Sequence, residues 1–253
     1  MFKKAIVRKP CPEMIHGLSS GSLGKPVYER ALDQHAAYVE ALRSCGLEVY
    51  ILEADPRFPD STFVEDVALC TPGFAVLTNP GAPSRNGETA DMKPVLESYY
   101  ARVECIAPPG TLDAGDVMMV GQHFYIGLSD RTNREGAGQL ARILENYGMT
   151  ATTVPLHHML HLKSGVSYLE QNHMLVSGEF VDHPSFRGYH QIHVDPNESH
   201  AANSLWVNST VLVPAGFPNT LKHIEQAGFR TKVLDVSEFQ KLDGGLSCLS
   251  LRF

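Results

Sequence analysis

Short hydrophobic runs that end in Pro or Gly recur along the chain and predict a series of β-strands, each followed by a turn. Five runs share this shape, and they start at Ala5, Ala75, Phe124, His173 and Val211. The last four starting points are separated by 49, 49 and 38 residues. A spacing near fifty residues predicts an architecture of repeated structural units.

A second series of apolar strands has a polar residue at the entrance of each strand. The five polar residues are Asp66, Asp116, Ser164, Asn203 and Cys248. The fifth of these strands lies at the C-terminus and lacks a following partner, so we expect it to pair with the N-terminal strand. Five such units account for all 253 residues without a linker, which predicts a single domain over residues 1–253.

Most units also carry a helical pattern of apolar residues. Thr132 to Glu135 matches a capping box, which predicts Thr132 as the cap of a helix that ends at Gly148. The fourth unit has Pro and Gly where a helix should follow Val181, so we expect that unit to lack one. The predicted helices cover residues 27–45, 90–101, 132–148 and 220–227. Such α/β units, related by rotation, would gather the polar strand entrances around a central axis, where we expect the functional site.

Composition and charge exclude several classes of protein. With 43% hydrophobic and 19% charged residues the chain is expected to fold, and no apolar run reaches the roughly 18 residues of a membrane span. The net charge of −7 argues against nucleic-acid binding and is compatible with a cationic small molecule. Five cysteines without a C-x-x-C pair, and no secretion signal, predict a cytoplasmic protein.

Cys248 and His161 are the candidates for nucleophile and proton carrier. Cys248 follows two glycines that we expect to allow a tight turn, exposing the thiol at the start of a strand, although a small buried side chain is the competing interpretation. His161 supplies a group that titrates near neutrality. His157 and His161 also have the i, i+4 spacing of a metal pair, but no acid follows in the pattern of a metal-dependent hydrolase.

Two pairs of acids lie beside apolar strands rather than on a charged helix face. They are Glu65 with Asp66 and Asp113 with Asp116, in equivalent positions of two units. Such acids often cap turns. In a chain with a candidate thiol they also suit a pocket for a guanidinium group, which carboxylates bind in a forked geometry.

Six ordered motifs from Leu18 to Cys248 resemble the dimethylarginine dimethylaminohydrolase family of the guanidine-modifying superfamily, which includes arginine deiminases and amidinotransferases. The resemblance implies a five-bladed α/β propeller of ββαβ-type repeats around a central active site. The motifs are Phe63–Asp66, Gly81–Arg85, Leu112–Asp116, His161–Ser164, Ala201–Asn203 and Asp243–Cys248.

The resemblance also implies a role for each matching residue. Cys248 would be the nucleophile, His161 the general acid and base, and Asp113 the acid that supports the histidine; family members have Glu or Asp there. Asp66 would hold the guanidinium group. Asp60, Glu65, Arg85 and Arg131 would line the pocket and hold the amino-acid end of the substrate, and Leu18 would lie on a mobile lid. Leu242 and Asp243 would make backbone or side-chain contacts near the nucleophile.

The implied reaction is the hydrolysis of dimethyl- and monomethyl-arginine to citrulline through a covalent intermediate on Cys248. It needs no metal or organic cofactor, and zinc bound to Cys248 would inhibit it. Family habit suggests a homodimer. The alternatives are an arginine deiminase, although those enzymes typically carry an extra helical domain, an amidinotransferase, a metal-dependent hydrolase, and a non-catalytic sensor of arginine-like ligands.

Overall fold

The structure, a computed structural model, describes residues 1–21 and 23–253. The chain divides into two compact units. Unit 1 comprises residues 1–64 and 165–253, and unit 2 comprises residues 65–164. Within the described residues, unit 1 holds three three-stranded sheets and unit 2 holds two.

All five sheets have the same topology. The central strand pairs antiparallel with one neighbour and parallel with the other. In unit 2 the sheets are β3 (Ala68–Cys70), β4 (Ala75–Leu77) and β5 (Val103–Cys105), and β6 (Val117–Val120), β7 (His123–Leu128) and β8 (Thr150–Pro155). In unit 1 they are β15 (Leu251–Arg252), β1 (Lys4–Arg8) and β2 (Glu48–Leu52); β9 (Val166–Glu170), β10 (His173–Val176) and β11 (His190–His193); and β12 (Leu205–Val207), β13 (Thr210–Pro214) and β14 (Arg230–Leu234).

The five central strands are the five hydrophobic runs from which the repeat was predicted. The terminal strands also pair as expected, because Ala5 lies opposite Arg252 and Ile6 opposite Leu251. The fold class predicted from the sequence, five pseudo-symmetric α/β repeats of the propeller type, is therefore confirmed.

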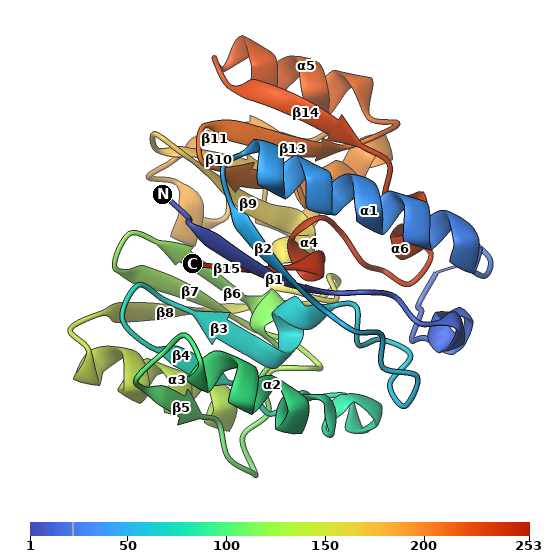
Figure 1. Cartoon of the computed structure of the whole chain (residues 1–253). Coiled ribbons are helices and arrows are strands. Elements are labelled where there is room, and N and C mark those ends of the chain that lie inside the picture. Colours follow the sequence, from blue (N-terminus) through green and yellow to red (C-terminus); the bar gives the residue numbers. More distant parts are fainter. Residues whose placement is uncertain (22) are drawn as a thin grey trace. The chain divides into compact units, whose positions relative to one another are not determined.

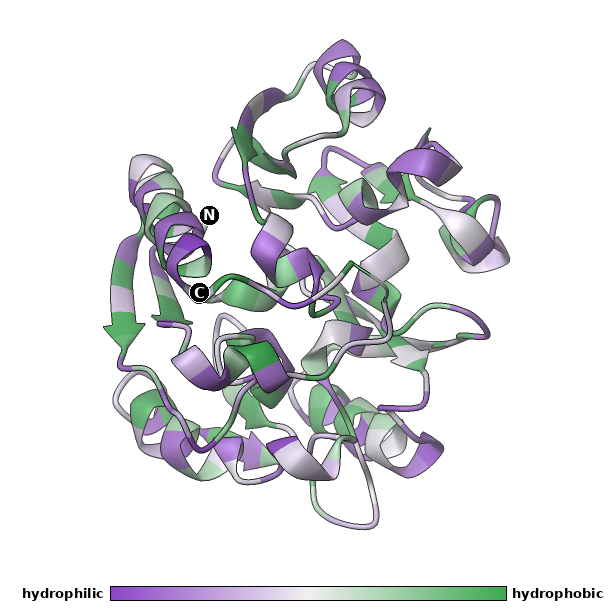
Figure 2. Cartoon of the chain, turned by 90° about the vertical axis from the view of Figure 1, so that its right-hand side faces the viewer, coloured by the Kyte–Doolittle hydropathy of each residue, from purple (hydrophilic) through white to green (hydrophobic). Residues whose placement is uncertain are grey.

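The helices follow the predicted pattern, including the fourth repeat, for which no helix was predicted. The longer ones are α1 (Tyr28–Ser44), α2 (Glu88–Glu97), α3 (Arg134–Asn146) and α5 (Pro218–Gln226), and the short ones are α4 (Leu162–Gly165) and α6 (Ser237–Gln240). The fourth repeat has two 3-10 turns, Gly178–Phe180 and Pro184–Phe186, in place of a helix. In Figure 2 the helices carry both hydrophilic and hydrophobic residues, as amphipathic helices do.

The prediction that Thr132 caps α3 was wrong. The cap is Asn133, whose side chain accepts a hydrogen bond from the Gly136 N–H at 2.8 Å. Asn and Thr are both favoured at this position, Asn more strongly, and the capping-box spacing pointed to Thr132 instead. The Thr132 hydroxyl instead donates to the carboxylate of Asp116 at 2.7 Å.

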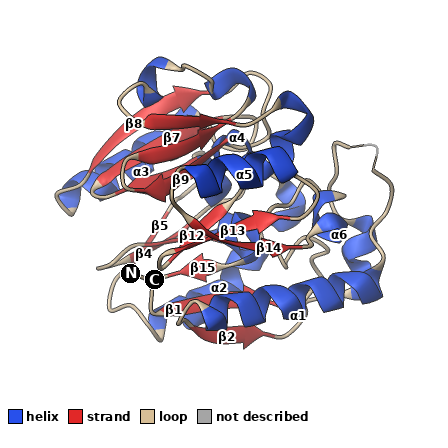
Figure 3. Cartoon of the chain, turned by 90° about the horizontal axis from the view of Figure 1, so that it is seen from above, coloured by secondary structure: helices blue, strands red, loops and turns tan. Residues whose placement is uncertain are grey.

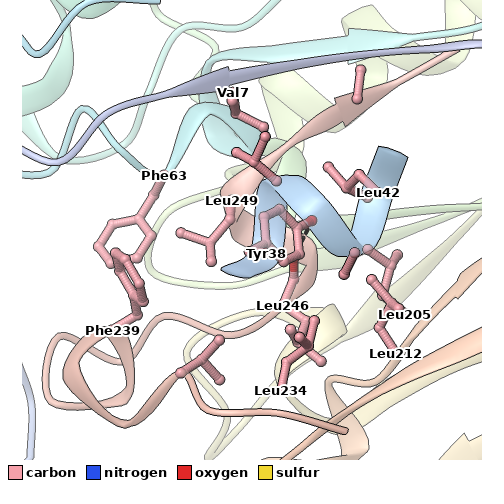
Figure 4. Packing of buried hydrophobic residues seen from close by; sticks show 14 of the residues in the cluster. Val7, Tyr38, Leu42, Phe63, Leu205, Leu212, Leu234, Phe239, Leu246 and Leu249 are labelled. Atoms are coloured by element: carbon pink, nitrogen blue, oxygen red, sulfur yellow. Dashed lines mark hydrogen bonds between the residues drawn. The ribbon is translucent and has the colours of Figure 1, made fainter. Parts of the chain in front are cut away.

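In unit 1 a hydrophobic core fixes the segment that carries Cys248. Helix α1 runs beside β2 (Figure 3) and buries Tyr38 against Leu246 and Leu249, as Figure 4 shows. The Tyr38 hydroxyl is 2.8 Å from the Leu246 carbonyl and 2.6 Å from the Ser250 hydroxyl. These contacts hold the chain on both sides of Cys248.

In unit 2 helix α3 lies against β7 and β8 (Figure 1). A buried cluster that includes Leu112, Ala114 and Val117 forms the core there, and the Phe74 ring stacks on Tyr147 with centroids 3.8 Å apart. This core fixes the backbone around Asp113 and Asp116. Among the described residues, no helix has the length and apolar character needed to cross a membrane.

Each polar entrance residue lies in or next to a short helical turn that leads into the first strand of its repeat. The turns are Val64–Val67, Ala114–Asp116, Leu162–Gly165, Pro196–Ala202 and Ser247–Leu249. Cys248 therefore lies in a helical turn and not at the start of a strand, because β15 begins only at Leu251. The predicted equivalence of the five positions is confirmed.

Candidate active site

Three carboxylates surround the imidazole of His161 in unit 2. His161 lies directly before α4 and is 8% exposed. Its Nδ1 is 3.4 Å from Asp116 Oδ2, and its Nε2 is 3.8 Å from Asp113 Oδ2 and 4.0 Å from Asp66 Oδ1. Burial by itself lowers the pKa of His161, but Asp116 first, then Asp66 and Asp113, outweigh it and raise the pKa to about 9. His161 therefore carries a proton at neutral pH.

The close approach of these groups depends on Gly115. A Cβ atom at this position would lie 2.7 Å from Asp66 Oδ1 and 3.1 Å from the His161 ring. The Gly115 N–H also donates to Asp66 Oδ1 at 3.0 Å. A glycine is thus required where the turn before β6 meets the imidazole and the Asp66 carboxylate.

The two carboxylate oxygens of Asp113 have different surroundings. It is fully buried, and its Oδ1 accepts a hydrogen bond from the Gly81 N–H at 2.8 Å. Its Oδ2 has no hydrogen-bond partner among the residues that the structure describes. Burial, and after it the charge of Asp66, raises the pKa of Asp113 to about 6. The spare oxygen lies on the side of His161 Nε2, where it can accept a proton or bind a cationic ligand.

Asp66 is paired with a buried arginine. Arg85 Nη1 lies 2.6 Å from Asp66 Oδ2, and the same guanidinium makes a forked contact with both oxygens of Glu88 at 3.0 and 2.9 Å. Burial raises the pKa of Asp66, but Arg85 and His161 outweigh it, so the net shift is downward. Burial opposes the charge of Arg85 too, yet Glu88 and Asp66 raise the pKa of that guanidinium well above its usual value. Both groups therefore remain charged.

Two further predicted site residues lie in unit 2. Glu65 is buried and pairs with Lys163 at 2.8 Å. Arg131 is half-buried, and its backbone N–H donates to the Ser129 hydroxyl at 3.0 Å. The backbone of Arg131 also lies close to Gly81, so that a side chain at position 81 would collide with it.

Cys248 is positioned within unit 1 by backbone and amide contacts. The Gly245 N–H points at Cys248 Sγ over 3.4 Å, which favours negative charge on the sulfur. Asn203 clamps the same turn, because its side chain donates to the Ser247 hydroxyl at 3.0 Å and accepts from the Ser247 N–H at 2.9 Å. This places two polar strand entrances, Asn203 and Cys248, next to each other.

The glycines before Cys248 serve close packing and not the tight turn that the sequence predicted. Side chains at Gly244 and Gly245 would collide with Phe63 and Asn203 respectively. The left-handed backbone in this segment is that of Asp243, with φ at 59°.

The remaining predicted residues form a separate group in unit 1, around the segment 17–21. Asp60 Oδ1 accepts a hydrogen bond from the Leu18 N–H at 3.0 Å. Asp243 Oδ2 accepts from the Ser20 N–H at 2.6 Å and the Ser20 hydroxyl at 2.9 Å. Leu242 is buried, whereas Leu18 is 39% exposed. Both carboxylates thus hold the backbone of the segment to which the predicted lid residue belongs.

The site in unit 2 includes residues to which the sequence gave no role in the reaction. Asp116 was predicted as a polar strand entrance and as one of the paired acids of a guanidinium pocket, but not as a partner of the histidine; its carboxylate is the one at ion-pair distance from His161 Nδ1. Glu88 and Lys163 are partners of predicted residues. Of these, only Asp116 had a signal in the sequence, namely its register with Asp66.

Within residues 1–21 and 23–253, one group of side chains has the spacing of metal ligands. It consists of Asp66, Asp113 and His161, with ligand atoms within 4.8 Å of one another. The pairing of His157 with His161, considered from the sequence, is not part of it. Because Asp66 already binds Arg85 and the Gly115 N–H, the oxygen available to a cation is Asp113 Oδ2.

Comparisons with known proteins show the family of this chain. A family model described as eukaryotic N,N dimethylarginine dimethylhydrolase matches residues 21–183. The N(G),N(G)-dimethylarginine dimethylaminohydrolase of Pseudomonas aeruginosa is 50% identical over 254 residues, covering 100% of both chains. The enzyme of that name from Streptomyces coelicolor is 38% identical over 99% of this chain and 96% of its own.

Solved structures with the same fold include a member of this family. A cysteine-to-serine mutant of the Pseudomonas aeruginosa enzyme, complexed with citrulline, covers both chains fully with a TM-score of 0.99 and 50% identity. The N-terminal domain of ArgZ, a cyanobacterial arginine dihydrolase, has a TM-score of 0.87 at 19% identity over 100% of this chain and 97% of its own, which shows the shared fold alone. The chain described here belongs to the dimethylarginine dimethylaminohydrolase family.

Proposed function

We propose that this chain hydrolyses Nω,Nω-dimethyl-L-arginine, and the monomethyl compound, to L-citrulline with release of dimethylamine or methylamine. The observation that carries the proposal is the excess of buried carboxylates around His161. Asp66, Asp113 and Asp116 are buried around the imidazole, and Arg85 pairs with Asp66 and with the buried Glu88. Such a site favours a cationic ligand. The full-length relative from Pseudomonas aeruginosa, whose mutant was solved with citrulline, supports the choice of substrate.

In the first half of the reaction the Cys248 thiolate attacks the guanidinium carbon of the substrate. A guanidinium carbon is a weak electrophile because its charge is delocalised, so a strong, soft nucleophile is needed. The bond from carbon to the methylated nitrogen breaks, and that nitrogen takes the proton of His161 as it leaves. A covalent S-alkylthiouronium remains on Cys248.

In the second half, neutral His161 removes a proton from water as the water oxygen bonds to the same carbon. The bond from carbon to sulfur then breaks, the hydroxyl of the adduct loses its remaining proton to solvent, the thiolate leaves and citrulline is released. The carboxylates around His161 make it a strong base once it has lost its proton. Asp113 supports the histidine and Asp66 holds the guanidinium group of the substrate. No metal or organic cofactor enters this scheme.

The other residues expected from the family resemblance are proposed to bind the rest of the substrate. Asp60, Glu65, Arg85 and Arg131 line the site and hold the amino-acid end, and Leu242 and Asp243 contact the substrate near the nucleophile. Leu18 belongs to the segment that closes over it. The hydrogen bonds that the Leu18 N–H donates to Asp60 and the Ser20 N–H donates to Asp243 support this closing role.

The direct test is an assay with dimethylarginine, monomethylarginine and arginine in parallel, with chelator present, reading citrulline and the released amine. Citrulline and dimethylamine in equal amounts are expected, with complete loss in Cys248→Ser. Cys105→Ser is the matched control, because Cys105 is an exposed cysteine in β5, and it should retain activity. Ammonia from arginine alone would contradict the proposal in favour of a deiminase. Binding without turnover would point to a transferase or a sensor.

We also propose a cytoplasmic homodimer. Cys11, Cys45 and Cys105 are thiols, which suits a reducing compartment. Light scattering during size-exclusion chromatography should give twice the chain mass of 27.8 kDa, and a mass of one chain would contradict the dimer.

A further inference from the structure

Two histidines lie side by side on neighbouring strands of the fourth repeat, in unit 1. His173 opens β10 and His190 opens β11, and the two residues are partners in the parallel register of these strands (Figure 1). Residues opposite each other in a sheet direct their side chains to the same face. The two imidazole rings have their centroids 5.1 Å apart and their planes inclined at 40°.

The ring of His173 has one nitrogen prepared for a metal ion. Its Nδ1 lies 2.8 Å from the carbonyl oxygen of Gln171. Because a carbonyl oxygen can only accept, Nδ1 carries the hydrogen and the lone pair of the neutral ring lies on Nε2. Histidines that bind metal ions typically donate their other N–H to a backbone carbonyl in this way. The Phe229 ring packs edge-on against His173, with centroids 5.3 Å apart, and restricts its rotation.

The other ring nitrogens of the pair are available to a ligand. Nε2 of His173 and both ring nitrogens of His190 have no hydrogen-bond partner within residues 1–21 and 23–253. His173 is half-buried and His190 is exposed, so an ion can reach the pair from solvent.

The separation of the two rings matches that of two imidazoles bound to one ion. A ligating imidazole nitrogen lies about 2.0–2.1 Å from the metal, which places the ring centroid about 3.2 Å from it. At the angles of tetrahedral and octahedral coordination, two such centroids are about 4.5–5.2 Å apart. The observed 5.1 Å falls in this range. The rings of His157 and His158, by contrast, have centroids 6.4 Å apart, which is outside it.

Hydrogen bonds hold the starts of the two strands in this register. The His190 N–H donates to the Asn172 carbonyl at 2.8 Å, and the Asn172 side chain donates to the Gly188 carbonyl at 3.1 Å. The backbone at both histidines is therefore already in place for binding, which lowers the free-energy cost of bringing the two ligands together.

We propose that His173 and His190 form a surface site for a divalent transition-metal ion of the kind that imidazole prefers, such as Ni²⁺, Cu²⁺ or Zn²⁺. The two imidazoles occupy neighbouring positions on the ion, and water occupies the others, because His190 is exposed. The site shares no residue with the group of Asp66, Asp113 and His161, and the inference does not depend on the proposed function.

The test is a titration of the whole chain with Ni²⁺, followed in ¹H–¹⁵N NMR spectra. Ni²⁺ is the probe because it binds imidazole well, is paramagnetic and, unlike Cu²⁺, does not oxidise cysteine thiols. We expect the backbone amides of residues 172–174 and 189–191 to broaden with one common midpoint. Broadening near other ligands, such as Cys248 or His161, is read separately because each amide reports its own surroundings.

His173→Gln and His190→Gln each remove one ligand, and His193→Gln is the matched control. His193 is an exposed histidine of the same strand, and its side chain points to the opposite face from that of His190 because three residues separate them. The midpoint Ni²⁺ concentration should rise at least roughly 10-fold in each of the first two variants and stay unchanged in the control. No selective broadening at residues 172–174 and 189–191 would overturn the proposal. A midpoint unchanged in His190→Gln would overturn it too, because a single imidazole would then account for the binding.

Discussion

Two sets of acids were predicted to bind the substrate, and the structure gives them different surroundings. In unit 1, Asp60 and Asp243 accept hydrogen bonds from backbone N–H groups of the segment 17–21. In unit 2, Asp66, Asp113 and Asp116 crowd around one imidazole, and Asp113 keeps a buried oxygen without a partner among the described residues. Acids satisfied by backbone donors shape a loop, whereas acids in excess of their donors store electrostatic free energy that a cationic substrate or a proton can use.

The largest effect on stability is expected when Arg85, the cation that pairs with Asp66 and Glu88, is replaced. Arg85→Met leaves Asp66 and Glu88 buried without the guanidinium that pairs them, and breaking such a pair from one side lowers the free energy of unfolding by about 3–5 kcal/mol. Denaturant unfolding measures this. Arg142→Met is the matched control in unit 2, because Arg142 pairs with Glu135 at the surface, and it should change stability by less than about 1 kcal/mol. A similar decrease in the free energy of unfolding in both variants would show that the buried pairing of Arg85 is worth no more than a surface ion pair, which would contradict this prediction.

Asp113→Asn should raise stability in a pH-dependent way. The pKa of Asp113 is raised to about 6 in the folded chain, so its ionisation disfavours the folded state. Below about pH 4 the carboxyl is neutral in both states, and wild type and variant should be similar. As the pH rises through about 6 the wild type loses this contribution, and the variant should become more stable by about 3 kcal/mol. A difference in stability that does not vary from pH 4 to pH 8 would contradict this account of the cluster.

Asp243→Asn should give the smallest effect. The Asn side chain retains an oxygen acceptor but loses the charge that strengthens both bonds to Ser20. The free energy of unfolding should fall by less than about 1 kcal/mol, while the Ser20 amide exchanges its hydrogen faster. Exchange at the Gly136 amide, capped by Asn133, serves as the internal reference. An unchanged rate at Ser20 would mean that Asp243 does not hold the segment.

The repeat was predictable from the sequence because each central strand is a buried hydrophobic run followed by a turn. The pairing of the terminal strands followed from counting the strands. The sequence could not distinguish Thr132 from Asn133 as the cap of α3, since either side chain suits that position locally, and the Thr132 hydroxyl is engaged by Asp116, which lies 16 residues earlier in the same repeat.

The candidate site was predictable as a set of residues but not as a set of contacts. The motifs identified His161, Asp66 and Asp113, and the register of the strand entrances marked Asp116. The distances from Asp113 and Asp116 to the two ring nitrogens of His161 depend on how closely two loops pack at Gly115. No local sequence pattern encodes that packing.

The central claim is that the surrounding carboxylates keep His161 protonated at neutral pH. It is tested most directly by NMR titration of His161 in the wild-type protein, with His161→Gln used to assign its resonance. The ring should be fully charged at pH 7 and titrate near pH 9, above the ordinary value of 6.5. Titration at or below pH 6.5 would contradict the claim, because burial would then outweigh the attraction of Asp116, Asp66 and Asp113.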